Sequence, residues 1–181
     1  MTPMTNYEQF IFVSRYAKWL DDEQRRETWA ETTDRYVGFF KDHLEKYGVK
    51  RGDEVYKTVR TAILNRDVMP SMRCLMTAGP ALERENLAGF NCSGVAVNDV
   101  RAFDEALYIL SCGTGLGFSV ETKHTSQLPR VPETLTTSDK TIVVEDSREG
   151  WADAYRQLIT SLYDGRIPSW NVDQVRPAGA R

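Results

Sequence analysis

Residues 91–121 of this chain read NCSGVAVNDVRAFDEALYILSCGTGLGFSVE, a pattern of strand, helix and second strand. Asn91–Val97 predicts a strand because its β-branched residues favour extended backbone. Asp99 then occupies a favourable N-cap position for a helix. That helix is amphipathic, with an apolar stripe made of Phe103, Ala106, Leu107 and Leu110. Phe118–Glu121 predicts the second strand, so this segment indicates the α/β class.

Three glycines, Gly113, Gly115 and Gly117, separate the helix from the second strand. A dinucleotide-binding fingerprint places its glycines after a strand and before a helix, so that the phosphates meet the helix N-terminus. The order here is reversed, which excludes that fingerprint. Two interpretations stay open: a tight turn, or a backbone that a ligand approaches closely because no Cβ intervenes.

The residues before this segment predict helices. Three apolar stripes with steps of three and four residues mark them: Phe10, Val13, Ala17 and Leu20; Trp29, Tyr36, Phe40, His43 and Tyr47; Val55, Val59, Ala62 and Ile63. The second helix should stop before Gly48. We therefore expect a helical N-terminal subdomain over residues 1–65. From residue 66 onward, strand-like runs alternate with helices.

The residues after this segment continue the α/β pattern. We expect a loop over 123–139, a strand over 141–145, a helix over 151–162 and a last strand over 171–176. About four strands without a closing helix leave open edges. Residues 66–181 therefore form either a small complete α/β domain or the front part of a larger sheet or barrel.

Composition narrows the function classes. The 181 residues carry a net charge of −3, with 41% hydrophobic and 27% charged residues, as in ordinary globular proteins. The sequence has no excess of basic residues that would indicate nucleic-acid binding. It also has no apolar run that predicts a membrane span, and its N-terminus lacks the pattern of a secretory signal. Three cysteines without a CxxC pair fit a reducing cytoplasm.

Among the cysteines, Cys92 is the candidate reactive thiol, because its neighbours Asn91 and Ser93 are polar. Cys74 and Cys112 lie in apolar runs and are expected to be buried. The two histidines, His43 and His124, lack the spacing of a metal-binding helix, so we expect no metal site formed by this chain alone.

Five segments in this order resemble the N-terminal part of a ribonucleotide reductase catalytic chain. They are residues 69–82 (MPSMRCLMTAGPAL), 89–93 (GFNCS), 103–121 (FDEALYILSCGTGLGFSVE), 146–151 (DSREGW) and 176–181 (RPAGAR). The resemblance is strongest to the monomeric, adenosylcobalamin-dependent class II type, which reduces ribonucleoside triphosphates. It implies that residues 66–181 are the first, incomplete part of a ten-stranded α/β barrel built from two halves.

The resemblance also assigns roles. In these enzymes a thiyl radical removes the 3′ hydrogen of the ribose, and a cysteine matching Cys92 acts with a partner cysteine on the opposite face of the sugar. The pair supplies two electrons, becomes a disulfide and is reset by thioredoxin or a similar dithiol. Ser71, Asn91, Gly115 and Gly117 match substrate-binding positions. Asp99 matches an acidic residue of the site for a deoxynucleotide effector, although it serves equally as a helix N-cap.

The radical cysteine, the partner of Cys92, the terminal dithiol and the cobalamin surface all match later family sequence. We therefore expect a cytoplasmic oxidoreductase of deoxyribonucleotide synthesis that is inactive alone. It would be a split subunit, the segment upstream of an intein, or a truncated copy. Its adenosylcobalamin would be bound mainly by a complementary C-terminal chain or segment. Alternatives are a non-catalytic nucleotide-binding or regulatory module and a remnant that folds poorly.

Overall fold

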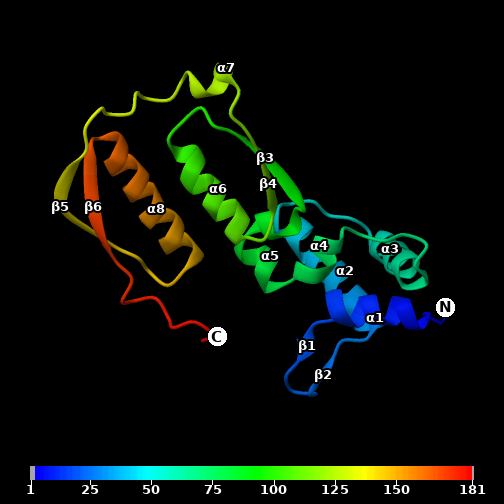
Figure 1. The fold of residues 1–181 in the computed structure, drawn as a ribbon. Helices are drawn as coiled ribbons and strands as arrows, with labels where there is room; N and C mark the ends of the chain where they lie inside the picture. The colour runs from blue at the N-terminus through cyan, green and yellow to red at the C-terminus, as the bar shows by residue number, and fades with distance from the viewer. Residues whose placement is uncertain (1–2, 181) are drawn as a thin grey trace. The chain divides into compact units, whose positions relative to one another are not determined.

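The computed structural model describes residues 3–180, which form two compact units divided between Phe90 and Asn91 (Figure 1). The first unit is helical. The second consists mainly of strands and helices in alternation, so the chain mixes helix and strand as expected. The expected boundary between residues 65 and 66 coincides with the end of the third helix. It stays a prediction.

The first unit contains three longer helices, with a two-stranded hairpin between the first and the second, and short helices after the third. The elements are α1 (Asn6–Arg15), β1 (Trp19–Leu20), β2 (Arg25–Arg26), α2 (Trp29–Lys46), α3 (Asp53–Asn65), α4 (Met72–Thr77), α5 (Pro80–Arg84) and the 3-10 helix η1 (Asn86–Gly89). The first two helices begin with capping boxes, in which Thr5 and Glu8, and Thr28 and Glu31, satisfy the exposed N–H groups reciprocally.

The core of the first unit lies where these helices cross. Phe12 and Trp29 pack edge to face with ring centroids 5.6 Å apart. The cluster is completed by Ala17, Ile63 and Leu75. The predicted first stripe was wrong in part, because α1 ends at Arg15 and Leu20 lies in β1. Phe10, the first member of that stripe, is exposed.

A buried ion pair ties the helices of the first unit to the segment that follows them. The Glu27 carboxylate accepts hydrogen bonds from the Nε of Arg35 at 2.7 Å and from the Oγ1 of Thr32 at 2.9 Å. The Nη1 of Arg35 donates to the carbonyl oxygens of Leu75 and Ala78, both at 3.0 Å. One guanidinium therefore satisfies two carbonyls at the C-terminal end of α4, where a helix leaves its carbonyls without internal partners.

The second unit consists of two strand–helix–strand repeats. Strand β3 (Cys92–Ala96) pairs in parallel with β4 (Gly115–Ser119) through α6 (Arg101–Ser111). Strand β5 (Thr136–Val143) pairs in parallel with β6 (Arg166–Asn171) through α8 (Arg148–Tyr163). Parallel neighbours need such crossovers. The short α7 (Thr122–Thr125) lies between the repeats.

The two crossover helices pack side by side (Figure 1). The Asp104 carboxylate of α6 is 2% exposed and accepts from the Nε of Arg156 in α8 at 3.0 Å. The Nε of Arg101 donates to it at 3.3 Å. This contact orients one repeat against the other, because a carboxylate so deeply buried must keep its cationic partners.

Three further expectations are corrected. The alternation of strand-like runs with helices expected from residue 66 begins only at β3, because residues 72–89 form the three short helices α4, α5 and η1. The last strand is Arg166–Asn171 rather than 171–176, because Gly165 at φ +76° ends the preceding helix and β6 starts at once. The predicted loop 123–139 contains most of α7 and the first half of β5, whose exposed threonines and serine conceal its strand character.

Within residues 3–180 the strands form three two-stranded sheets, so the ten-stranded barrel stays a prediction. In the same part of the chain, no helix combines the length and the hydropathy that a membrane span needs.

The buried pair yields a stability prediction. Burial opposes ionisation of Glu27, but the bonds from Arg35, Lys18 and Thr32 hold its pKa below 4.5. The contribution of Glu27 to the free energy of unfolding is therefore full above pH 4.5 and is lost as the pH falls through the lower folded-state pKa. We expect Glu27→Gln to lower the free energy of unfolding by roughly 3–5 kcal/mol at pH 7, since Arg35 loses its charged partner.

Urea unfolding between about pH 3 and pH 7 measures both effects. The matched control is Lys57→Met, which removes the exposed ion pair with Glu54 and should leave the midpoint unchanged. Equal losses in the two variants would contradict a special role for the buried pair.

Candidate functional site

One face of the β3–β4 pair carries only small side chains. Side chains alternate between the two faces of a strand. The set Val95, Val97, Phe118 and Val120 lines a cavity together with residues of α6 and α8. The other face carries the residues in between, which we call the small-residue face: Cys92, Gly94, Ala96, Gly115, Gly117 and Ser119. That face therefore points away from the helices.

The pairing register places the candidate thiol beside a glycine. Cys92 opens β3 opposite Gly115, and Gly94 lies opposite Gly117. A Cβ at Gly115 would lie 3.9 Å from the Sγ of Cys92. Cys92 is exposed and free, which confirms the sequence-based expectation of an accessible thiol. Its register partner across the strand pair, Gly115, has no side chain.

The three glycines of this face differ in how much room the fold leaves for a side chain. None has the left-handed backbone that favours glycine, unlike Gly113 at φ +81°. A Cβ at Gly115 would lie 3.2 Å from the carbonyl oxygen of Asn91, which accepts the Gly115 N–H at 2.8 Å. At Gly94 and Gly117 the nearest atoms would lie 3.9 and 3.8 Å away, an ordinary contact. Internal packing therefore does not explain these two glycines.

The glycine run had two interpretations, a tight turn or a backbone that a ligand approaches closely, and each applies to different glycines. Gly113 forms the turn between α6 and β4. Gly115 and Gly117 lie within β4 and leave its backbone bare on the exposed side. Such a surface suits a flat ligand that must come close to the main chain. Gly94 was missed by sequence reasoning; the signal was its two-residue spacing from Cys92.

The remaining predicted substrate residues fall in different units. Asn91 is exposed and adjoins the small-residue face through its bond to Gly115. Ser71 lies in the first unit, where it is the exposed N-cap residue of α4 and makes no side-chain capping bond. The structure thus brings Asn91, Cys92, Gly115 and Gly117 together, and the role of Ser71 stays a prediction.

Asp99 differs slightly from its expected capping position. The N-cap residue of α6 is Val100, and Asp99 accepts the backbone N–H of Arg101 at 2.7 Å from one position earlier. Its carboxylate therefore supports the start of the helix, as the sequence suggested. The predicted contact with a deoxynucleotide effector stays a prediction.

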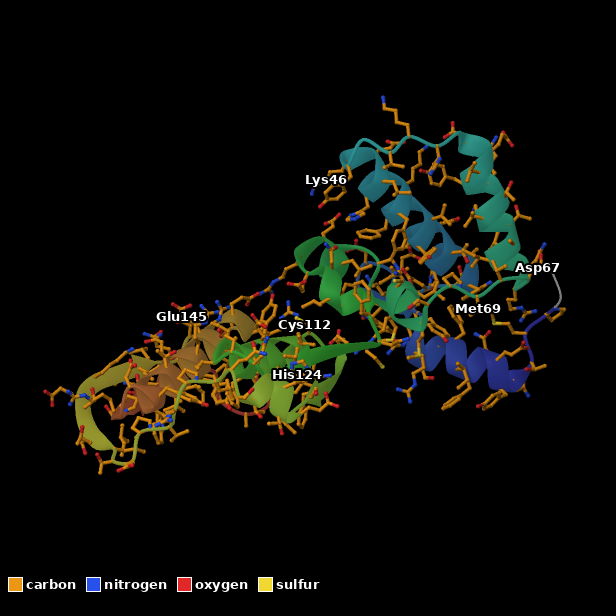
Figure 2. The ribbon with its side chains drawn as sticks, turned by 90° about the horizontal axis from the view of Figure 1, so that it is seen from above. Lys46, Asp67, Met69, Cys112, His124 and Glu145 are labelled. Atoms are coloured by element: carbon orange, nitrogen blue, oxygen red, sulfur yellow. The ribbon has the colours of Figure 1, made fainter. Side chains whose placement is uncertain are left out.

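The other two thiols lie in different surroundings. Cys112 directly follows α6, at the place labelled in Figure 2. It is buried as expected, and the Nη1 of Arg148 donates to its Sγ at 3.4 Å. Cys74, which was expected to be buried, is only half-buried, with its Sγ 3.5 Å from the carbonyl oxygen of Gly89. Among residues 3–180 no group of three or more His, Cys, Asp or Glu side chains could hold a metal ion. His124 contacts Glu121 at 4.0 Å.

No family model matches the sequence, and no curated protein does either. A solved structure does resemble the chain: the crystal structure of a B12-dependent (class II) ribonucleotide reductase. The TM-score is 0.79 over 96% of this chain, with 20% sequence identity. At that identity the comparison shows that the fold is shared. The chain spans only 33% of the length of that reductase.

The exposure of the thiols predicts their reactivity. In the native chain we expect Cys92 to react with Ellman's reagent first, Cys74 more slowly, and Cys112 only after unfolding, because burial blocks access. Stopped-flow absorbance measures the phases. Cys92→Ser should remove the fast phase, and its persistence in that variant would show that another thiol is the accessible one.

The glycines give a second prediction. Gly117→Ala should keep or raise the free energy of unfolding, by up to about 1 kcal/mol, because alanine loses less chain entropy and meets no close atom. Gly115→Ala should lower it relative to Gly117→Ala, since the Asn91 carbonyl must move. Thermal unfolding of both variants compares them. A larger loss in Gly117→Ala would mean that packing within the chain requires that glycine.

Proposed function

We propose that this chain is part of a ribonucleotide reductase, to which it contributes the redox thiol of Cys92 and one wall of the substrate pocket. The observation that carries the proposal is the exposed Cys92 beside the bare backbone of Gly94, Gly115 and Gly117. The shared fold with a class II reductase supports it.

Ribonucleotide reduction needs both the exposed thiol and the bare backbone beside it. A ribose must lie close to the protein for a thiol to reach its 2′ carbon, and glycine backbone permits that approach. After a thiyl radical takes the 3′ hydrogen, one proton of the thiol pair passes to the 2′ hydroxyl, the C2′–O bond breaks and water leaves. The Cys92 thiol and a partner thiol then form a disulfide while their two electrons and the second proton reduce C2′, and the radical cysteine returns the 3′ hydrogen. Only a thiol pair offers this reversible two-electron step.

The partner thiol comes, under this proposal, from outside the described residues. Cys112 is buried against Arg148, which keeps it from substrate and from any reductant. Cys74 belongs to the first unit and is half-buried. A complementary reductase chain or segment would therefore carry the partner of Cys92 and the radical cysteine, and the isolated chain would be inactive. A thioredoxin-like dithiol would reduce the disulfide after each turnover.

The remaining assignments follow the same resemblance. Ser71 and Asn91 would help to hold the ribonucleotide, for which a triphosphate is the proposed form, and Asp99 would contact a deoxynucleotide effector. The carboxylate of Asp99 is exposed, which is compatible with that contact.

Adenosylcobalamin does not fit the described residues. A corrin ring with amide side chains and a nucleotide tail needs polar partners, whereas the large cavity of the second unit is lined almost wholly by apolar side chains. The proposal therefore assigns the cofactor to the complementary chain.

The test is multiple-turnover reduction by the assembly that contains this chain, with a dithiol reductant, under anaerobic conditions. Cys92→Ser should abolish multiple turnover while leaving assembly intact, because serine cannot form the disulfide. Cys74→Ser is the matched control and should retain activity. Deoxynucleotide formation over many turnovers in Cys92→Ser would overturn the redox role and favour a non-catalytic nucleotide-binding module.

A further inference from the structure

The β5–β6 pair changes from apolar to polar along the side that faces α8. At one end, Ile142 and Trp170 pair in the register and line the large apolar cavity. At the other end, Ser138, Lys140 and Arg166 line a second cavity together with residues of α8. Side chains that face a helix are normally apolar, so hydroxyl and cationic groups there indicate a role other than packing.

We call this second cavity the polar cavity, because every residue of its lining is polar or charged. It measures about 340 Å³, which suits a small molecule. Helix α8 lies against both strands (Figure 1) and contributes residues spaced three and four apart, which share one side of a helix. From α8 these are Arg156, Gln157, Thr160, Ser161 and Asp164.

A bulge in β5 directs side chains into the polar cavity. The four steps from Thr137 to Thr141 match only two steps along β6, so β5 holds two extra residues at this place. Within the bulge, the Ser138 hydroxyl oxygen accepts the backbone N–H of Lys140 at 3.1 Å. Pro168 in β6 explains a missing ladder bond but not the extra residues. Since bulges often redirect side chains beside functional sites, this one supports a binding role for Ser138 and Lys140.

The polar cavity has an excess of positive charge. Lys140, Arg156 and Arg166 bring three cations, against one carboxylate from Asp164. The Nε of Arg156 donates to the buried Asp104 at 3.0 Å, which holds this guanidinium in place and leaves its Nη2 available to a ligand. Among the described residues, Lys140 and Arg166 form no ion pair. These two cations repel each other, and an anion between them would remove that repulsion.

Hydroxyl groups add to the donors of the polar cavity. The Ser138 oxygen accepts the Lys140 N–H, so its own proton can be donated to a ligand. Thr160 is exposed on α8 and adds a second hydroxyl. Phosphate oxygens accept strong bonds from ammonium and guanidinium groups and further bonds from hydroxyls, so the lining matches a phosphate-type oxyanion. Asp164, at the C-terminal end of α8, opposes the anion together with the helix dipole, which limits the affinity.

A nucleoside gains nothing from the polar cavity. The lining has no aromatic ring for a base to stack on and no aliphatic side chain. It also contains none of the residues that resemble substrate or effector positions, which are Ser71, Asn91, Cys92, Asp99, Gly115 and Gly117. The polar cavity is therefore a separate site, whose ligand is a phosphate group without a base.

We infer that the polar cavity binds inorganic phosphate or pyrophosphate through Lys140, Arg156 and Arg166. The hydroxyls of Ser138 and Thr160 would donate further bonds to the same anion. Such a ligand would join the bulge of β5 to β6 and α8, so that its binding stabilises the second repeat. The site lies wholly within that repeat and does not depend on the proposed function.

Isothermal titration calorimetry of the whole chain with pyrophosphate at low ionic strength tests the site. We expect saturable binding with a dissociation constant below about 1 mM. Lys140→Met and Arg166→Met should each weaken binding roughly tenfold, because each removes a charge-assisted bond. The matched control is Arg130→Met, since Arg130 is exposed on a loop and lines neither cavity. Asp164→Asn should strengthen binding, because it removes the opposing charge.

Circular dichroism checks that the variants fold, and further probes identify the ligand. Inorganic phosphate measured beside pyrophosphate shows which anion the cavity prefers, and either preference supports the site. Tripolyphosphate should bind at least as tightly as a nucleoside triphosphate. The inference is overturned by an absence of saturable binding, by full binding in both Lys140→Met and Arg166→Met, or by a nucleoside triphosphate that binds about tenfold more tightly than tripolyphosphate. An equal loss in Arg130→Met also overturns it, since binding would then be general charge attraction. None of these measurements uses reductase activity.

Discussion

The parallel register between β3 and β4 is the constraint on which the candidate site depends. It sets Cys92 opposite Gly115 and Gly94 opposite Gly117, and a shift by one residue would turn the thiol toward the helices. The hydrogen bond from the Gly115 N–H to the Asn91 carbonyl fixes that register at the very start of both strands. The crossover helix α6 and the turn at Gly113 connect the two strands and place β4 beside β3.

The first unit meets a different constraint, which is the burial of a charge. Arg35 reaches from α2 to the last carbonyls of α4, and Glu27 neutralises it from the loop before α2. The segment with Ser71 is thereby fixed at its C-terminal end by a long side chain rather than by a sheet. Both units thus hold the segments that resemble the reductases in defined conformations, one through backbone pairing and one through an ion pair.

The sequence predicted those elements whose signals are local. The periodicity of α2 and α8, the stop before Gly48 and the strand at Cys92 all follow from residues close in the chain. The short helices α4 and α5 were missed, and α4 in particular depends on a group distant in the sequence, the guanidinium of Arg35. Cys92 could be singled out from its neighbours, but its pairing with Gly115 is set by the crossover, which no local pattern encodes.

The small-residue face also has a consequence for how such a sequence changes over generations. Alanine at Gly94 or Gly117 would meet no close atom, and glycine within a strand carries an entropic disadvantage of roughly 0.5–1 kcal/mol relative to alanine. Selection for folding alone would therefore replace both residues. Under the proposed function, glycine would therefore be kept at these two positions only in chains whose small-residue face still binds a ligand.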